Sequence, residues 1–184
     1  MFDKSAHKII FTGPVGSGKS TAINAISDIP VISTEQVATD HVKDRKETTT
    51  VALDYGMIRV GDGEAIHLYG TPGQERFSFM WDILVENAIG IVILVDNAND
   101  DPLADLSFFL KSFKNFITNS AIAVGITRTD IKGGPVLSDY HRILKGFDFN
   151  PPVFEVDGRK KEEISFLIQA LLFSVDQSFI ENTD

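Results

Sequence analysis

One stretch of the sequence decides the fold: Gly13-Pro14-Val15-Gly16-Ser17-Gly18-Lys19-Ser20. It follows a β-rich apolar run at residues 8–12 and opens an amphipathic stretch at residues 19–27. The order G-x-x-x-x-G-K-[ST], placed between a strand and a helix, is typical of a phosphate-binding loop. Glycines let successive backbone N–H groups turn inward around phosphate oxygens, and the helix that follows adds the positive end of its dipole.

Two side chains of this loop have distinct expected roles. The pattern predicts that Lys19 reaches the outer phosphates and that the Ser20 hydroxyl ligates Mg2+. The sequence therefore predicts a nucleoside triphosphate bound together with magnesium. The residues expected to touch the nucleotide in this loop are Gly13, Val15, Gly16, Ser17, Gly18, Lys19, Ser20 and Thr21.

Outside the loop, short apolar runs alternate with longer amphipathic stretches, which is the pattern of an α/β sheet protein. We expect strands at residues 8–12, 51–60, 65–69, 90–96, 121–127 and 153–157, and helices at 19–27, 75–87, 103–116, 136–147 and 161–179. Gly61-Asp62-Gly63 reads as a hairpin turn, which makes residues 51–60 antiparallel to the next strand. The expectation is a three-layer α/β P-loop NTPase fold. It would have a mostly parallel six-stranded sheet with one antiparallel edge strand, about five helices, and a single domain over residues 1–184.

Bulk composition excludes several classes of function. The chain has 184 residues, a net charge of −9 and no cysteine. Acidity repels phosphate backbones, so we expect no general nucleic-acid binding. The lack of cysteine removes disulfides, thiolate metal sites, prenylation and palmitoylation. The longest strongly apolar run, residues 88–95, is too short to span a bilayer, so we expect a cytoplasmic protein with no direct membrane anchor.

Four further segments fall at expected strand ends, where open α/β sheets bind ligands. They are Thr50-Val51-Ala52-Leu53-Asp54-Tyr55, Gly70-Thr71-Pro72-Gly73-Gln74-Glu75-Arg76-Phe77, Thr127-Arg128-Thr129-Asp130 and Asp157-Gly158-Arg159-Lys160. In their order, and over nearly the whole chain, they resemble the Ras/Rab/Arf small GTPases. Residues 48–56, together with residues 70–77 leading to Met80-Trp81-Asp82, resemble the bacterial MglA-like branch.

The resemblance implies roles for the segments that face the phosphates. Thr50 would be the switch I threonine, which ligates magnesium and meets the γ-phosphate. Gly73 would sense the same phosphate from switch II. Gln74 would orient the attacking water, with Lys19 as the second catalytic group.

The base-reading segments receive roles in the same way. Asp130 would take both guanine N–H groups in a bidentate pair. Thr127 and Arg128 precede it in the same segment. Backbone N–H groups of Asp157 and Gly158 would meet the guanine oxygen, and Arg159 completes the nucleotide-binding set.

The chain departs from the family pattern at three places. Gly70 stands where the family usually has an aspartate that holds a magnesium-bound water, and Arg128 stands where it usually has lysine. Switch I is long, because Ser20 and Thr50 are 50 − 20 = 30 positions apart. Within it, Arg45 could act in cis on the transition-state charge, or it could be one solvated charge among its charged neighbours.

The resulting hypothesis is a GTP-operated switch that hydrolyses GTP slowly. The resemblance implies a Roadblock-type (MglB-like) activating protein and further effectors as partners. Two alternatives stay open, a GTP-binding module without turnover and a P-loop small-molecule kinase. Phe108, Phe109, Phe113 and Phe116 are expected in the core. Trp81 is expected either on a partner-facing helix surface or half-buried, and Asp96 in a solvated loop.

Overall fold

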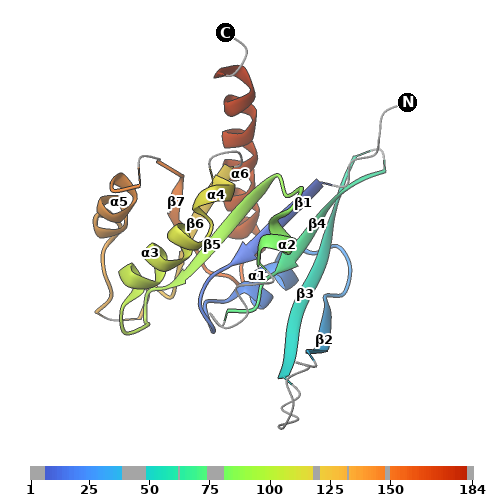
Figure 1. Cartoon of the computed structure of the whole chain (residues 1–184), viewed down its shortest axis with the longest axis horizontal. Coiled ribbons are helices and arrows are strands. Elements are labelled where there is room, and N and C mark those ends of the chain that lie inside the picture. The colour runs from blue at the N-terminus through green and yellow to red at the C-terminus, as the bar shows by residue number, and fades with distance from the viewer. Residues whose placement is uncertain are drawn as a thin grey trace.

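The computed structural model describes residues 7–38, 49–61, 63–73, 81–117, 121–131, 133–147 and 150–181, without the side chains of 34–38, 49–52, 117 and 176–181. Strands and helices alternate along the chain, apart from one run of three strands and one pair of consecutive helices (Figure 1). The strands are β1 (His7–Thr12), β2 (Ile32–Ala38), β3 (Thr49–Val60), β4 (Glu64–Gly70), β5 (Gly90–Asp96), β6 (Ala121–Thr127) and β7 (Val153–Glu155). The helices are α1 (Lys19–Ile26), α2 (Trp81–Val85), α3 (Pro102–Ser112), α4 (Lys114–Ile117), α5 (Leu137–Lys145) and α6 (Lys161–Glu181).

The described strands form one sheet in the order β2-β3-β4-β1-β5-β6-β7. β3 runs antiparallel to both β2 and β4, whereas the pairs among β4, β1, β5, β6 and β7 are parallel. The mostly parallel α/β fold is therefore confirmed, as is the hairpin that joins β3 to β4. β1 lies between β4 and β5, so the loop that follows β1 opens at the point where the connections change direction along the sheet.

Two details of the expected fold were wrong. No strand was expected between residues 30 and 49, but β2 pairs with β3 from Ile32 opposite Tyr55 to Ala38 opposite Thr49. β2 is polar because it is an edge strand and carries little apolar periodicity. The sheet accordingly has seven strands, and its antiparallel strand β3 is second from the edge. The helix expected at residues 103–116 is two helices, since Phe113 leaves helical geometry with φ −100° and ψ 11°.

Helices cover both faces of the sheet and give three layers. On one face α1 and α6 pack on alternate residues of β1 and β5, including Ile9, Phe11 and Leu94. On the other face α2, α3 and α5 pack on Ile10, Ile93 and their neighbours. Period-two alternation along these strands produces the two separate cores. Among the described residues, no helix has the length and apolar character needed to cross a membrane.

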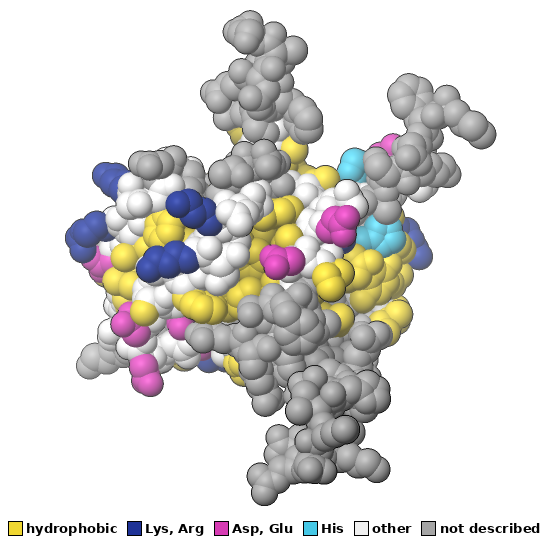
Figure 2. Space-filling model, in the orientation of Figure 1, with side chains coloured by type: hydrophobic (Ala, Val, Ile, Leu, Met, Phe, Trp, Pro, Cys, Tyr) yellow, Lys and Arg dark blue, Asp and Glu magenta, His cyan; other side chains and the backbone are white. Residues whose placement is uncertain are grey.

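Alternation also divides β3 and β4 into two faces. Gly56 and Gly70 face α1, because a Cβ at either would lie within 3.1 Å of an Ile23 side-chain atom. On the opposite face Tyr55 stacks on His67, and the Tyr55 hydroxyl lies 2.8 Å from His67 Nδ1. Figure 2 shows hydrophobic and histidine side chains gathered over β3 and β4 on the right of the view. Residues at even positions of β3 therefore belong to the α1 side, next to the loop after β1.

Candidate nucleotide-binding site

The loop between β1 and α1 has a backbone that only glycine adopts easily. Gly13, Gly16 and Gly18 have φ values of 139°, 81° and 95°. A Cβ at Gly13 would lie 2.0 Å from the carbonyl oxygen of Leu94. Gly18 precedes α1, and its carbonyl accepts a hydrogen bond from the Ala22 N–H at 2.8 Å. The glycines thus let the loop fold back against β5 and lead directly into the helix.

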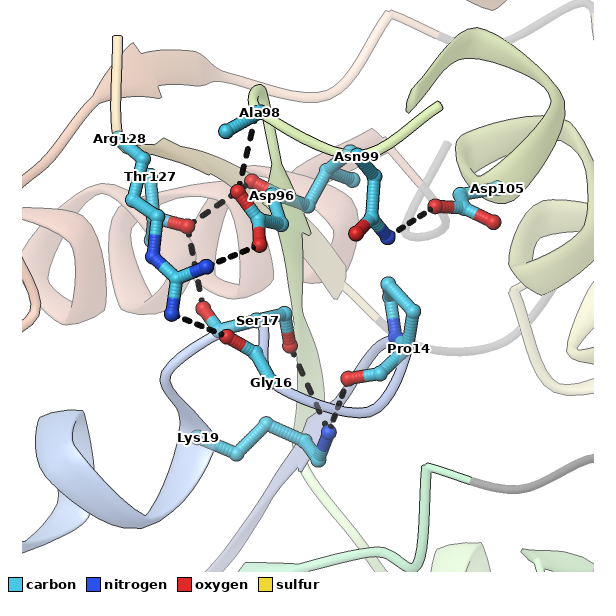
Figure 3. Close-up of polar contacts among 11 residues, drawn as sticks. Pro14, Gly16, Ser17, Lys19, Asp96, Ala98, Asn99, Asp105, Thr127 and Arg128 are labelled. Atoms are coloured by element: carbon cyan, nitrogen blue, oxygen red, sulfur yellow. Dashed lines mark hydrogen bonds and ion pairs between the residues drawn. The ribbon is translucent and has the colours of Figure 1, made fainter. Parts of the chain in front are cut away.

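Lys19 is buried inside this loop, with 9% of its surface exposed. Its Nζ donates to the carbonyl oxygens of Gly13 at 2.8 Å and Pro14 at 2.6 Å, and to Ser17 Oγ at 3.4 Å. Figure 3 shows the ammonium turned back toward the loop. Burial lowers the pKa of Lys19 to about 8, and the negative charge of Asp54 partly opposes that shift. The loop therefore holds a cation whose charge is poorly solvated until an anion arrives.

A carboxylate lies beside the Ser20 hydroxyl, which is the group expected to ligate magnesium. Ser20 Oγ donates a hydrogen bond to Asp54 Oδ2. Ser33 Oγ donates to the other oxygen, Asp54 Oδ1, at 2.6 Å. Asp54 comes from β3, 34 residues further along the chain than Ser20. No role was expected for Asp54 from the sequence, although the alternation of β3 could have placed it on the α1 side.

A cavity of about 720 Å³ opens between the loop and the carboxyl ends of β6 and β7. It brings together residues that are more than a hundred positions apart in the sequence. Its walls contain Ser17, Gly18, Thr21, Thr127, Arg128, Thr129, Asp130, Ile131, Glu155, Val156, Asp157, Gly158, Arg159, Lys160 and Glu163. This one cavity is lined by all six residues that were expected to contact the nucleotide base, and it lies next to the end of the phosphate-binding loop.

The end of β6 is tied to the loop through two side chains. Thr127 Oγ1 donates to the carbonyl oxygens of Ser17 at 3.1 Å and Val95 at 3.2 Å. Arg128, with a left-handed φ of 57°, donates to the Gly16 carbonyl at 3.1 Å and pairs with Asp96 Oδ2 at 2.5 Å. Figure 3 shows Arg128 spanning the space between β5 and the loop.

Asp96 is not in a solvated loop, as the sequence had led us to expect. Its side chain is only 3% exposed, whereas that of Arg128 is 49% exposed. A buried carboxylate needs a charged or hydrogen-bonded partner, and Arg128 supplies it. Asp96 therefore fixes the guanidinium that stands where the small-GTPase pattern has lysine.

The end of β7 carries an exposed ion pair. The Asp157 carboxylate accepts hydrogen bonds from the Arg159 backbone N–H at 3.0 Å, from Nε at 2.9 Å and from Nη2 at 2.8 Å. These bonds hold the pKa of Asp157 well below its usual range and raise the pKa of Arg159. The Asp157 N–H donates to Glu163 Oε2 at 2.7 Å, so a base oxygen would compete with Glu163 for it.

Comparison with known proteins agrees with this geometry. Residues 11–132, which are 122 of the 184 residues, match the family described as conserved hypothetical ATP binding proteins. The chain belongs to this family. The matched region begins in β1 and includes the phosphate-binding loop, Asp54, Asp96, Arg128 and Asp130.

Individual proteins similar to this chain point to a second group, the small GTPases. Human Ras-related protein Rab-27A is 26% identical over 149 residues, which cover 73% of this chain and 67% of that protein. An uncharacterized protein of Methanocaldococcus jannaschii is 29% identical over 94 residues, covering 50% and 53%. Human ADP-ribosylation factor-related protein 1 is 26% identical over 128 residues, covering 66% and 56%. The matches thus span from about half to two thirds of these relatives. They support the Ras-like P-loop superfamily and a nucleotide-binding, GTPase-like protein.

The structure of this family member describes only part of the expected switch residues. Gly73 lies against the phosphate-binding loop, because a Cβ there would be 2.6 Å from the Val15 N atom. Thr50 lies in β3 opposite Val37, and its side chain is outside the described residues. Gln74 and Arg45 also lie outside the described residues. Their roles stay predictions.

Trp81 is neither on a partner-facing surface nor half-buried. It is 2% exposed and packs on Phe109 and Phe113, with centroid distances of 5.2 Å to each ring. Its Nε1 donates to the Pro72 carbonyl at 3.3 Å. Phe109 and Phe113 are buried in the core, and Phe108 and Phe116 pack against it, as expected. The rings of Phe108, Phe109 and Phe113 contact Trp81, the single tryptophan of the sequence.

Proposed function

We propose that the chain is a guanine-nucleotide switch that binds GTP with magnesium and hydrolyses it slowly. One observation carries the proposal: a single cavity connects the phosphate-binding loop, at Ser17, Gly18 and Thr21, with Asp130 at the end of β6. A second supports it, since Gly73 lies on the same loop and would meet a γ-phosphate there. The output of such a protein is a changed surface for a partner.

The base preference rests on Asp130. Guanine presents two neighbouring N–H donors on one edge, which a carboxylate accepts in a bidentate pair. Adenine offers a single amino donor on the corresponding edge, so the second carboxylate oxygen would lose its partner. The family description names ATP. We therefore treat adenine nucleotide as the competing ligand, and Asp130 as the residue that decides between the two.

The residues of the loop suit magnesium. Hydroxyl and carboxylate oxygens are the donors that this hard cation prefers, and Ser20 places a hydroxyl beside a carboxylate. Among the described residues, no group of three or more His, Cys, Asp or Glu could hold a metal. Such a sparse protein shell fits an ion that takes several ligands from phosphates and water. Ser20 and Thr50 would hold it, and it would neutralise charge on the outer phosphates.

The remaining roles follow from the small-GTPase resemblance. Thr50 and Gly73 would hold the γ-phosphate and release it after hydrolysis, which frees both switch segments. Lys19 would stabilise the outer phosphates, Gln74 would position the water, and Arg45 would add charge in cis. A Roadblock-type activator and separate effectors would read these segments in the cytoplasm, as in the MglA-like branch.

Calorimetry with Mg2+ tests the ligand. We expect GTP and GDP to bind, and ATP and ADP to bind at least tenfold more weakly. Asp130→Asn should lower the affinity for GDP roughly 10- to 100-fold, because the carboxylate that accepts both guanine N–H groups is lost. Val136→Asn, at an exposed position outside the cavity, serves as the control. Equal binding of ATP and GTP would overturn the guanine assignment and favour the adenine ligand.

Single-turnover phosphate release then tests the reaction. Release of free phosphate from GTP without an added acceptor separates hydrolysis from a kinase, and a complete lack of release indicates a binding module. Gln74→Leu should leave GTP affinity intact and slow release. An unchanged rate in this variant would show that another group positions the water.

A further inference from the structure

We propose that Asp54 supplies the carboxylate of the magnesium shell, in place of the aspartate that small GTPases usually have where this chain has Gly70. The inference rests on the proposed function, because the ion is expected only with a bound nucleotide. It moves the carboxylate from β4 to the neighbouring strand β3. It also resolves how the metal is supported in a chain with glycine at the customary position.

The register of the sheet places the two positions side by side. Asp54 in β3 is the direct partner of Gly70 in β4. A Cβ at Gly70 would lie 3.2 Å from Asp54 Cβ and 3.4 Å from Asp54 Oδ2. The Asp54 side chain therefore occupies the space that a side chain at position 70 would enter. Glycine at 70 and aspartate at 54 form a matched pair.

The contacts of the carboxylate point it at the metal-binding hydroxyl. Oδ2 accepts from Ser20 Oγ, and Ser33 Oγ holds Oδ1 from β2. Burial lowers the pKa of Lys19 and the charge of Asp54 partly opposes that shift, so the carboxylate also acts on the phosphate-binding cation. Ser33 acts as an outer support of the kind that orients metal-binding carboxylates.

Other polar groups near Gly70 form hydrogen bonds or ion pairs with residues other than Ser20. Thr71, which follows Gly70, is buried, and its hydroxyl donates a hydrogen bond to Thr12 Oγ1 of β1 at 2.9 Å. Asp96 pairs with Arg128 and accepts from the Ala98 N–H. Of the carboxylates in the described part of the chain, Asp54 is the one bonded to Ser20.

The strand that carries Asp54 gives the arrangement a consequence. Thr50, the expected switch I ligand, lies four positions earlier in β3. Besides Ser20, the two residues expected to support the magnesium ion, Thr50 and Asp54, then both belong to β3, which is also the strand that pairs with β2. Magnesium binding should therefore be coupled to the order of β3 and switch I more directly than to that of β4.

The test measures how magnesium retards nucleotide release. A fluorescent GDP analogue, labelled on the ribose, is released from the wild type, Asp54→Asn, Asp54→Ser and Asp54→Ser/Gly70→Asp over a series of free Mg2+ concentrations and in EDTA. Glu64→Gln is the control, because Glu64 lies opposite Val60 at the far end of the same strand pair.

We expect the Mg2+ concentration for half-maximal retardation to rise about 10- to 100-fold in both single variants, as for other groups that support a metal. Release in EDTA should match the wild type, and the Glu64→Gln variant should not change. The double variant should regain most of the magnesium response, because it returns the carboxylate to position 70.

Two results would overturn the inference. One is an unchanged Mg2+ dependence in Asp54→Asn and Asp54→Ser. The other is equal acceleration of release with and without Mg2+, which would make Asp54 only an anchor for Ser20. A wild-type chain that binds neither guanine nor adenine nucleotide would instead overturn the proposed function, and this outcome is seen before any variant is compared.

Discussion

The two halves of the candidate site are built from different materials. The phosphate half consists of a glycine-rich backbone around buried groups, with Ser17 and Lys19 exposed by only 1% and 9%. The base half consists of side chains on strand ends, where the Arg128 and Arg159 side chains are exposed by 49% and 78%. Few sequences can adopt the backbone geometry of the phosphate-binding loop, whereas the exposed side-chain pairs of the base half can be replaced by other pairs. The phosphate half should therefore respond to substitution through shape, and the base half through charge.

Gly13→Ala should have the largest effect on stability and nucleotide binding, because it disrupts the backbone geometry of the phosphate half. The added Cβ would lie 2.0 Å from the Leu94 carbonyl oxygen at a φ of 139°. We expect a loss of about 2–4 kcal/mol in the free energy of unfolding and no measurable nucleotide binding. Denaturant titration and calorimetry measure the two quantities.

Gly61→Ala is the matched control for that change. Gly61 also has a positive φ, 56°, but an added Cβ would meet nothing within 4 Å. It should cost about 1–2 kcal/mol of stability and leave nucleotide affinity unaltered. If both variants lost the same stability and kept binding, the close approach to Leu94 would not be what the loop requires.

Arg128→Ala should have the next largest effect on stability and nucleotide affinity, because it removes a positive charge from the base half. The change leaves the buried Asp96 carboxylate without its cation and frees the loop carbonyl of Gly16. We expect about 1–3 kcal/mol of lost stability, discounted for the exposure of Arg128. GDP and GTP affinity should fall equally, by roughly tenfold, because the base half does not touch the γ-phosphate.

The double variant Arg128→Ala/Asp96→Asn separates the two causes. A neutral amide removes the unpaired buried charge, so stability should return while nucleotide affinity stays low. Thermal or urea unfolding and calorimetry measure these quantities side by side. Unequal losses of GDP and GTP affinity would show that Arg128 also acts on the phosphates.

The same division explains what the sequence could predict. The loop at residues 13–20 could be located because glycine spacing and a following helix are local properties. Seven strands were present but six were expected, because polar β2 is defined only by its pairing with β3. Asp54 and Asp96 were missed, since their partners Ser20 and Arg128 are 34 and 32 positions away and are brought near only by the sheet. Long-range register decides such roles, and no local pattern contains it.

The pH dependence of binding isolates the cation of the phosphate half. Burial lowers the pKa of Lys19 to about 8 in the free protein, below the ordinary lysine value of 10.5. Bound phosphate favours the charged amine, so binding should take up roughly one proton per nucleotide at pH 9 and almost none at pH 7. Affinity should fall about tenfold between those values. Calorimetry in buffers of different ionisation enthalpy counts the protons.

Stability of the free protein should change with the opposite sign. Between pH 8 and 10.5 the unfolded chain holds the Lys19 proton more tightly than the folded chain does. Unfolding therefore takes up a proton, and stability should rise by about 1 kcal/mol from pH 7 to pH 9. A nucleotide affinity that does not change with pH over this range would mean that Lys19 keeps its charge in the free loop.

The smallest expected effect concerns the connection from the phosphate half to switch II. Trp81 Nε1 donates to the Pro72 carbonyl, and Gly73, the next residue, lies against Val15 of the loop. In the proposed switch Gly73 contacts the γ-phosphate at this place, so tryptophan fluorescence should differ between GDP and a non-hydrolysable GTP analogue. Trp81→Phe should cost only about 1–2 kcal/mol, because the aromatic packing is largely kept and one hydrogen bond is lost. Variants of the base half should alter the nucleotide concentration needed for the signal but not its size. Identical spectra in both nucleotides would mean that Pro72 does not follow the γ-phosphate, and switching would then have to proceed through β3 and Asp54.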